Sequence, residues 1–321
     1  MRICRLILAT TLAVTSTALL AENYPSKPIT LVVGFTPGGG ADAVARPMAE
    51  AIGKQLGQTV VMDYRPGAGG SIASAYVAKA PSDGYTVYMN SSGPYGADHV
   101  LFKGLKYDAA SFTPITRWTE TPLILAVNAR LGIRSTQELI SRARAQPDHF
   151  TYASSGSGTA THLAPLLFES AAGVKFRHVP YKGGAPAALA VAAGDVDLNF
   201  ASPPSIAPIS KTGRVTLLAV TSAQRSPMFP DLPAVSEAGL KDANYTFWWG
   251  LFGPAGLPKE VVDKLFEASA KALAEPEIRA KLEKSGNQPA PSPSVAEFTA
   301  WARTDGLRLK ELTEKSGAGV D

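Results

Sequence analysis

Apolar and polar positions along this chain follow the rhythm of α/β proteins. Residues 29–33 are an unbroken apolar or β-branched run, which predicts a strand buried on both faces. Val44, Met48 and Ile52 then recur at helical spacing and predict the following helix. Between them lies a glycine turn, residues 38–40. Without Cβ atoms there, a ligand can approach the unpaired N–H groups that begin a helix, and those donors favour an anion.

The same arrangement recurs near mid-chain. Residues 151–153 predict a strand, residues 154–159 a turn of serine, glycine and threonine, and residues 161–172 a helix. A single glycine turn more often makes only a tight corner. Two such turns in separate halves of the chain suggest two anion-binding loops that face a cleft between two lobes.

Other segments complete two α/β series, and the βαβ order predicts parallel strands whose carboxyl ends carry the ligand loops. Two extended stretches, residues 113–128 and 247–252, predict crossings between the lobes. The first lobe is therefore expected to hold residues 22–122 and 246–321, and the second residues 123–245. Further strands are predicted at residues 59–64, 85–89, 176–180, 196–201 and 215–221, and helices at 71–79, 136–146, 185–193, 259–274, 277–284 and 294–316.

The N-terminal segment has the pattern of an export signal. Arg2 and Arg5 precede an apolar stretch at residues 6–20, and small Ala21 follows it. The apolar stretch is short and interrupted by threonine and serine, which favours a cleaved signal over a membrane anchor. We therefore expect residues 1–21 to be removed, with cleavage near Ala21, and the mature protein to be periplasmic.

Composition narrows the possible chemistry. With 321 residues and 45% hydrophobic residues, the chain can bury sizeable cores in about two domains. Its one cysteine, Cys4, lies in the expected signal, so the mature chain would have no disulfide or thiolate site. Loss of Arg2 and Arg5 leaves 29 basic residues against 27 acidic ones, or +2. No basic cluster appears, so nucleic acid is not an expected partner.

None of the polar turns carries a convincing reactive group. Ser155 occupies the first glycine position that a nucleophile elbow around Ser157 would need. Thr161 and Ile72 stand where dinucleotide fingerprints would have their third glycine, and no turn ends in Gly-Lys-Ser/Thr. The four histidines lack metal-ligand spacing. The sequence therefore predicts no catalytic residue, cofactor or metal.

Three residues near the turns have two readings each. His162 opens the second helix, where its ring could bind a ligand or simply end the helix. Asp42 could contact a ligand or complement the dipole of the first helix. Tyr181 begins another turn after a strand, which could be a ligand loop or an ordinary surface loop.

Five short motifs follow one another in a fixed order. They are Tyr24-Pro25-x-Lys27-Pro28-Ile29, Val32-Val33-x-Phe35-x-Pro37-Gly38-Gly39-x-x-Asp42-x-x-Ala45-Arg46, Arg65-Pro66-Gly67-Ala68-Gly69-Gly70, Pro81-x-Asp83-Gly84-Tyr85 and Val179-Pro180-Tyr181-Lys182-Gly183. Together they resemble the Bug-type substrate-binding proteins of tripartite tricarboxylate transporters. The likeness runs from about Tyr24 to the C-terminus.

This resemblance implies a type II periplasmic-binding-protein fold, in which two α/β lobes joined by two crossing strands close over a small organic carboxylate. It also implies a monomeric receptor without catalysis or cofactor, which delivers its ligand to membrane permease subunits. Pro47 departs from the pattern, because it lacks the N–H of a continuing helix and is expected to shift or bend the first helix near its start. Carried over to this chain, the ligand-binding residues are Phe35, Thr36, Gly38, Gly39 and Asp42 in the first lobe and Ser155, Gly158, Thr159 and His162 in the second, with Ser91, Ser92 and Tyr181 as secondary candidates.

Two alternatives share the same cleft. One is an enzyme, a hydrolase or lyase, built on the two-lobed scaffold, and the other is a ligand-sensing subunit of a signalling system. The particular carboxylate depends on side chains that line the cleft, and the sequence alone does not place them.

Overall fold

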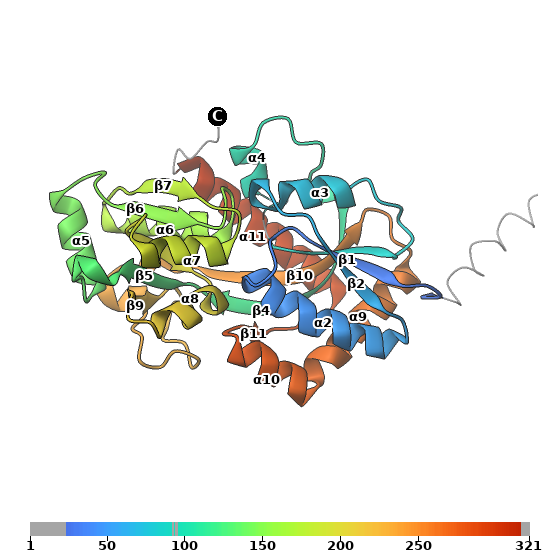
Figure 1. Cartoon of the computed structure of the whole chain (residues 1–321). Coiled ribbons are helices and arrows are strands. Elements are labelled where there is room, and N and C mark those ends of the chain that lie inside the picture. Colours follow the sequence, from blue (N-terminus) through green and yellow to red (C-terminus); the bar gives the residue numbers. More distant parts are fainter. Residues whose placement is uncertain (1–23, 92, 94–95, 316–321) are drawn as a thin grey trace, which may run out of the picture.

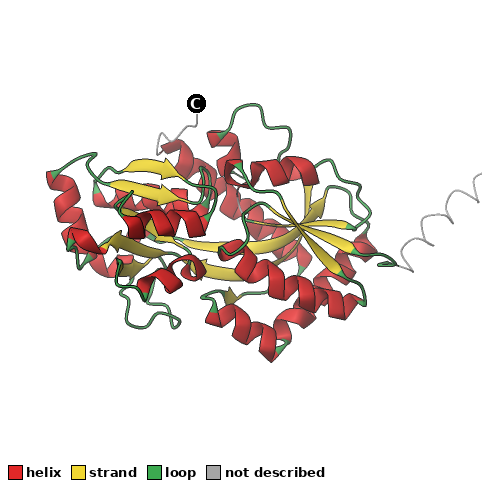
Figure 2. Cartoon of the chain, viewed as in Figure 1, coloured by secondary structure: helices red, strands yellow, loops and turns green. Residues whose placement is uncertain are grey.

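The structure is a computed structural model that describes residues 24–91, 93 and 96–315. Two β-sheets, of six and five strands, form its frame, and helices flank both sheets (Figure 2). The sheets lie side by side, and long strands run between the two halves of the molecule (Figure 1). The two-lobed α/β fold expected from the sequence is therefore present.

The first sheet has the strand order β11-β4-β10-β3-β1-β2. The apolar run at residues 29–33 forms β1, which pairs in parallel with β2 and with β3, as the βαβ order predicts. Val32 and Val33 are fully buried, because helices cover both faces of this part of the sheet. Its strands are β1 (Ile29–Val33), β2 (Val60–Tyr64), β3 (Thr86–Asn90), β4 (Phe112–Pro122), β10 (Thr246–Pro254) and β11 (Gln288–Pro289).

Helices α2 (Gly40–Leu56) and α3 (Ser71–Val77) connect the first three strands. Val44, Met48 and Ile52, the residues that predicted the first helix, are buried in the core against α9. The helix begins at Gly40 and continues through Pro47 without a break, so the expected shift at its start does not occur. One missing N–H in the third turn removes a single hydrogen bond, and packing of the buried face compensates for it.

The second sheet has the order β7-β6-β8-β5-β9, in which β6 is parallel to β7 and β8, and β5 is antiparallel to its neighbours. This is the second α/β series expected from the sequence. Its elements are β5 (Ile124–Asn128), α5 (Thr136–Ala145), β6 (Thr151–Ser154), α6 (Ala160–Ala172), β7 (Arg177–Pro180), α7 (Gly184–Ala193), β8 (Leu198–Ala201), α8 (Pro203–Ser210) and β9 (Val215–Val220).

The chain passes between the sheets at two neighbouring points. Only Leu123 separates β4 from β5, and β10 runs antiparallel to β4 along its length (Figure 1). Buried Thr221 joins the two points: its hydroxyl accepts the N–H of Leu123 (2.8 Å) and donates to the carbonyl of Tyr245 (2.6 Å). The two crossings thus form one hydrogen-bonded hinge.

The C-terminal helices return to the first sheet and then reach the second. These are α9 (Lys259–Ala274), α10 (Pro276–Lys284) and α11 (Val295–Lys315). Helix α11 packs on β4 and on the short helix α4 (Ala97–Leu101), and it also contacts α6 beside the second sheet. Short 3-10 turns are η1 (Ala68–Gly70), η3 (Ala109–Ser111), η4 (Ala129–Leu131), η5 (Val235–Ala238) and η6 (Lys241–Ala243).

The expected export signal, residues 1–21, lies outside the described residues. Across residues 24–91, 93 and 96–315, no helix combines the length and apolar character that crossing a membrane requires.

Candidate functional site

A small cavity lies where the loops after β1, β3 and β6 meet between the two sheets. Its volume is about 60 Å³, and a single water molecule needs about 10–15 Å³. The loops that line it follow the carboxyl ends of strands, the usual ligand position in open α/β sheets. The sequence-predicted residues that line it are Phe35, Thr36, Gly39, Ser91, Ser155, Gly158 and Thr159.

Three helices start at this cavity without side-chain caps. The N-cap residues of α2, α6 and α7 are Gly39, Thr159 and Gly183, and none of them makes a capping hydrogen bond. The first N–H groups of a helix have no partner within it, and the dipole makes that end partially positive. The first-turn residues that line the cavity are Gly40 and Ala41 of α2, Ala160 and Thr161 of α6, and Gly184 of α7.

Helix α8 also begins at the cavity but differs from the other three. Proline occupies its first two positions, so they have no N–H to offer. Its N-cap residue Ser202 lines the cavity, and the hydroxyl is 2.8 Å from that of Ser205. This helix therefore supplies a hydroxyl rather than backbone donors.

The two halves of the molecule touch across the cavity. The Thr36 hydroxyl donates to the carbonyl of Lys182 at 3.1 Å. A methyl group placed on Gly69 would lie 2.1 Å from the carbonyl oxygen of Ser157, so only glycine fits there. The φ angle of Gly69, +64°, also favours glycine. The arrangement is a closed one, with loops from both sheets in contact.

The electrostatic character of the cavity is unusual for an anion site. Among the described residues that line it, none is lysine, arginine or histidine, and Asp98 is the one with an ionisable side chain. Hydroxyl groups supply further donors: Ser155 Oγ donates to Thr159 Oγ1 at 3.1 Å and lies 2.8 Å from Thr161 Oγ1. Neutral backbone and hydroxyl donors can hold a carboxylate without a cation, as they do at helix N-termini generally.

His162 lies behind the second turn, outside the cavity lining. Its Nδ1 accepts the N–H of Gly158 at 3.2 Å, and its ring stacks on His178 at 4.2 Å. His178 is in turn 2.6 Å from Ser154 Oγ. Burial, reinforced by the neighbouring histidine, lowers the pKa of His162 to about 3, and burial lowers the pKa of His178 to about 4. Both rings are therefore neutral near pH 7 and shape the turn.

Three other predicted residues lie away from the cavity lining. Gly38 is exposed, and its N–H donates to Asp42 Oδ2 at 3.1 Å. Asp42 also pairs with Arg46 at 3.0 Å and accepts the hydroxyl of Tyr64. Burial acts to raise the pKa of Asp42. The hydrogen bonds from Tyr64, Gly38 and Arg46 outweigh burial and hold this pKa below its usual value. Tyr181 lines a neighbouring pocket, and Ser92 lies outside the described residues.

Several lining residues were not among the ligand-binding residues predicted from the sequence, although Asn90 begins a polar turn after a strand and Trp249 could be read either as a cleft wall or as packing at the hinge. Asn90 ends β3, and Asp98 lies on the five-residue helix α4, which has no visible periodicity. Phe247 and Trp249 come from the return crossing, and Trp249 packs edge-on against Phe35 with ring centroids 5.5 Å apart. Alternation along β10 could have indicated that Phe247 and Trp249 share one face of the strand, with Trp248 on the other.

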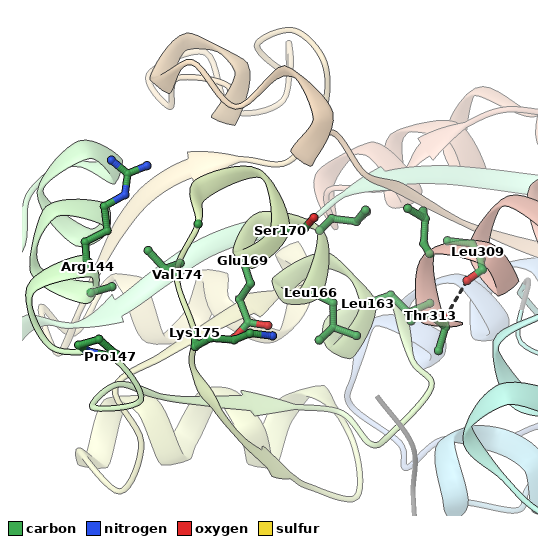
Figure 3. A pocket seen from close by; sticks show the side chains of 14 residues that line it. Arg144, Pro147, Leu163, Leu166, Glu169, Ser170, Val174, Lys175, Leu309 and Thr313 are labelled. Atoms are coloured by element: carbon green, nitrogen blue, oxygen red, sulfur yellow. Dashed lines mark hydrogen bonds between the residues drawn. The ribbon is translucent and has the colours of Figure 1, made fainter. Parts of the chain in front are cut away.

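A larger cavity of about 450 Å³ lies elsewhere, between α6, the end of α5 and the last turns of α11. Leucines of α6 and α11 line it (Figure 3). Two of its polar groups have partners: Arg144 donates to the carbonyl of Ala172, and Glu169 accepts the N–H of Phe176. Lys175 also lines it. The C-terminal end of α6 is the negative end of its dipole, so it favours an anion less than the helix N-termini of the smaller cavity do.

Metal binding has no support in the described residues, since no three histidine, cysteine, aspartate or glutamate side chains there are grouped to hold an ion. Two α/β lobes, paired crossing strands and a cleft ringed by helix N-termini define a two-lobed solute-binding protein. Residues 44–317 match the family model described as "Tripartite tricarboxylate transporter family receptor". The chain belongs to this receptor family, whose Bug-type members its motifs resemble, and it is not an enzyme.

Individual relatives agree with this assignment. A UPF0065 protein of the tcbD-tcbE intergenic region of Pseudomonas sp. strain P51 is 38% identical over 287 residues, covering 88% of this chain and 85% of the relative. The solved structure of R. palustris Rpa4515 with adipate is 34% identical with a TM-score of 0.88, covering 92% of this chain and all of that one. The structure of the periplasmic binding protein BugD is 32% identical with a TM-score of 0.84, and the match covers 93% of this chain and 100% of BugD.

Proposed function

We propose that this receptor binds a small organic carboxylate in the cleft between its two lobes and delivers it to the membrane permease of a tripartite transporter. The lobes are residues 22–122 with 246–321, and residues 123–245. The observation that carries the proposal is the convergence of three uncapped helix N-termini on a cavity without cationic side chains. Unpaired N–H groups on two opposing lobes favour an anion that is small enough to be enclosed.

Neutral donors suffice for useful affinity. A charge-assisted hydrogen bond to a carboxylate contributes roughly 1.5–3 kcal/mol. Roughly four to six such bonds exceed the costs of ordering and closure by about 8 kcal/mol, which is the binding free energy of a micromolar complex. The Rpa4515 structure with adipate supports a carboxylate as the ligand class.

The predicted residues divide into two proposed roles. Those on the cavity wall contact the ligand, whereas Gly38, Asp42 and His162 hold the two turns in shape through the hydrogen bonds they make. Tyr181, which lines the neighbouring pocket, is assigned to the rim of the cleft. The proposed contact residues are Phe35, Thr36, Gly39, Ser91, Ser155, Gly158 and Thr159.

The cellular setting follows from the same proposal. Export with cleavage near Ala21 would place the mature receptor in the periplasm as a monomer, beside the permease. A sensing role would use the same cleft. Loss of ligand uptake in cells that lack the receptor, with ligand-dependent gene expression retained, supports transport; the reverse pattern supports sensing.

The direct test fills the first turn. Gly39→Leu places a side chain between the N-termini of α2 and α7. A Cβ atom added to Gly39 would lie 3.9 Å from the backbone N atom of Gly184, so the rest of the leucine side chain would enter the space between these helix ends. Calorimetry should show carboxylate binding weakened by at least about a hundredfold, because the donors are blocked. The melting temperature without ligand should change little.

Glu50→Leu adds an apolar side chain at an exposed position of the same helix and serves as the control. A carboxylate that raises the melting temperature of the wild type and of Glu50→Leu, but not of Gly39→Leu, supports the cleft as the binding site. Equal affinity in Gly39→Leu contradicts it.

A further inference from the structure

Asp98 is a buried carboxyl group at the meeting point of the two lobes. Its side chain lies on α4 of the first lobe and the residue is 3% exposed. Oδ2 accepts the hydroxyl of Tyr107 at 2.8 Å. Oδ1 lies 3.5 Å from the position of a methyl group on Gly158, in the turn of the opposite lobe. Asp98 and Gly158 both line the cavity, so this carboxyl group borders the space that a ligand would fill.

A buried carboxylate is costly unless hydrogen-bond donors or a positive charge meet it. Burial, opposed by the Tyr107 hydrogen bond, raises the pKa of Asp98 to about 7. The titratable groups around it are Tyr107, Tyr88, the next residue His99, whose ring lies 6.1 Å from that of Tyr107, and, beyond the Gly158 turn, His162. The two tyrosines carry no positive charge, and burial lowers the pKa of His162 so that it is neutral near pH 7. Helix α11 packs against the start of α4 through its backbone: the atoms nearest to a Cβ atom added to Gly96 are backbone atoms of Gly306 and Lys310.

We propose that Asp98 selects the ligand class: the receptor takes a carboxylate that also carries an ammonium or hydroxyl group, which donates to Asp98 Oδ1. This inference rests on the proposed carboxylate-binding function and narrows it to amino or hydroxy monocarboxylates. The ligand carboxylate binds at the helix N-termini, and the ligand's own ammonium or hydroxyl group donates to Asp98, which is the one ionisable side chain among the described lining residues.

A dicarboxylate faces a different situation at this position. Its second carboxylate would meet ionised Asp98 at close range in a site of low dielectric, where like charges repel strongly. Binding then requires that one of the two groups take up a proton. Dicarboxylates should therefore bind this receptor weakly above pH 7, and their binding should be linked to proton uptake.

The test compares ligands of equal carbon number, from three to six carbons: the plain monocarboxylate, its amino and hydroxy derivatives, and the dicarboxylate. At about pH 8, wild-type receptor should bind an amino or hydroxy acid at least about tenfold more tightly than the matching monocarboxylate and dicarboxylate, a difference of about 1.4 kcal/mol. Asp98→Asn keeps the shape and the Tyr107 hydrogen bond but removes the charge. It should lose this preference and bind the dicarboxylate at least about tenfold more tightly than wild type does.

Asp231→Asn makes the same change of charge at an exposed residue outside the cavity and should leave the ranking unaltered. Calorimetry in buffers of different ionisation enthalpy gives a second readout: dicarboxylate binding should take up a proton in wild type and none in Asp98→Asn. An unchanged ranking in Asp98→Asn overturns this inference and leaves the carboxylate receptor standing. Failure of every compound to bind either protein overturns the proposed function and this inference with it.

Discussion

At the scale of single residues, buried aromatic groups shape the second ligand loop. The rings of His162 and His178 stack on each other and on Tyr152, whose centroid is 4.8 Å from that of His178. Each histidine uses a ring nitrogen to hold the turn, His162 through Gly158 and His178 through Ser154. A charged imidazolium could not accept the N–H of Gly158, so the turn depends on neutral rings.

This arrangement predicts a loss of stability in acid. The folded-state pKa values of His162 and His178, about 3 and about 4, lie below the ordinary histidine pKa of about 6.5. The unfolded chain therefore binds more protons than the folded one between these limits. The stabilisation is complete above pH 6.5 and is lost as the pH falls toward 4. Urea unfolding at several pH values should show that His162→Gln and His178→Gln flatten this slope, by up to about one proton each.

His149→Gln is the matched control, because His149 is exposed and lies outside the stack. A slope that stays the same in His162→Gln and falls in His149→Gln would contradict this explanation.

At the scale of elements, the three helices that begin at the cavity, α2, α6 and α7, have no stabilising side-chain cap at their N-termini. Ser135 caps α5 by accepting the N–H of Glu138 at 3.1 Å, whereas α2, α6 and α7 have no side-chain cap. Helices α9 and α10 also lack a cap, so what distinguishes α2, α6 and α7 is that their first-turn residues line the cavity. A cap would occupy the donors that an anionic ligand needs. We infer that these three helix ends are kept free for the ligand.

Adding a cap should therefore separate stability from binding. Gly39 has φ −95° and ψ −171°, extended values that suit a capping side chain. Gly39→Asp should raise the free energy of unfolding without ligand by a few tenths of a kcal/mol. It should weaken carboxylate binding at least about tenfold, because its charge competes for the same donors.

Gly39→Asn caps equally well without charge and should weaken binding less than Gly39→Asp. Chemical denaturation and calorimetry measure the two effects. Tighter carboxylate binding by Gly39→Asp would show that these helix ends do not hold the anion.

At the scale of the whole molecule, the structure is closed around its cleft. Thr221 ties the two crossing points together at the hinge, and the Thr36–Lys182 hydrogen bond and the contact of Gly69 with Ser157 join the far sides of the cleft. The crossing strands β4 and β10 are continuous with the first sheet. We therefore expect opening to occur by rotation at Leu123 and Tyr245, with each sheet moving as a unit.

Closure can be blocked at one contact. Gly69→Ala places a methyl group 2.1 Å from the carbonyl oxygen of Ser157, so the lobes cannot close fully. Carboxylate affinity should fall at least about tenfold, and small-angle scattering with saturating ligand should give a larger radius of gyration than for wild type.

Gly104→Ala provides the control. Gly104 has φ +71°, close to the +64° of Gly69, but nothing lies within 4 Å of its added methyl group. Backbone strain is therefore matched, and only the clash differs. Equal affinities in the two variants would mean that full closure is not needed for binding.

The sequence determined the elements, because each has a local physical cause. The apolar run at residues 29–33 forms β1 with the same bounds, and the helical spacing at residues 259–274 forms α9 likewise. The strand and helix order gave the parallel pairing of β1 and β2, and the strand, turn and helix at residues 151–172 gave β6 and α6. The ordered motifs resembled the Bug-type receptors, and the family match agrees.

Tertiary structure decided which side chains reach the ligand cavity. Hydrogen bonds turn Asp42 toward Arg46 and His162 toward Gly158, away from the cavity that their sequence neighbours line. Asp98 reaches it because α4 packs against α11, more than 190 residues further along the chain. Local patterns encode the backbone's preferences, whereas the direction of a side chain depends on partners that only the folded chain brings together.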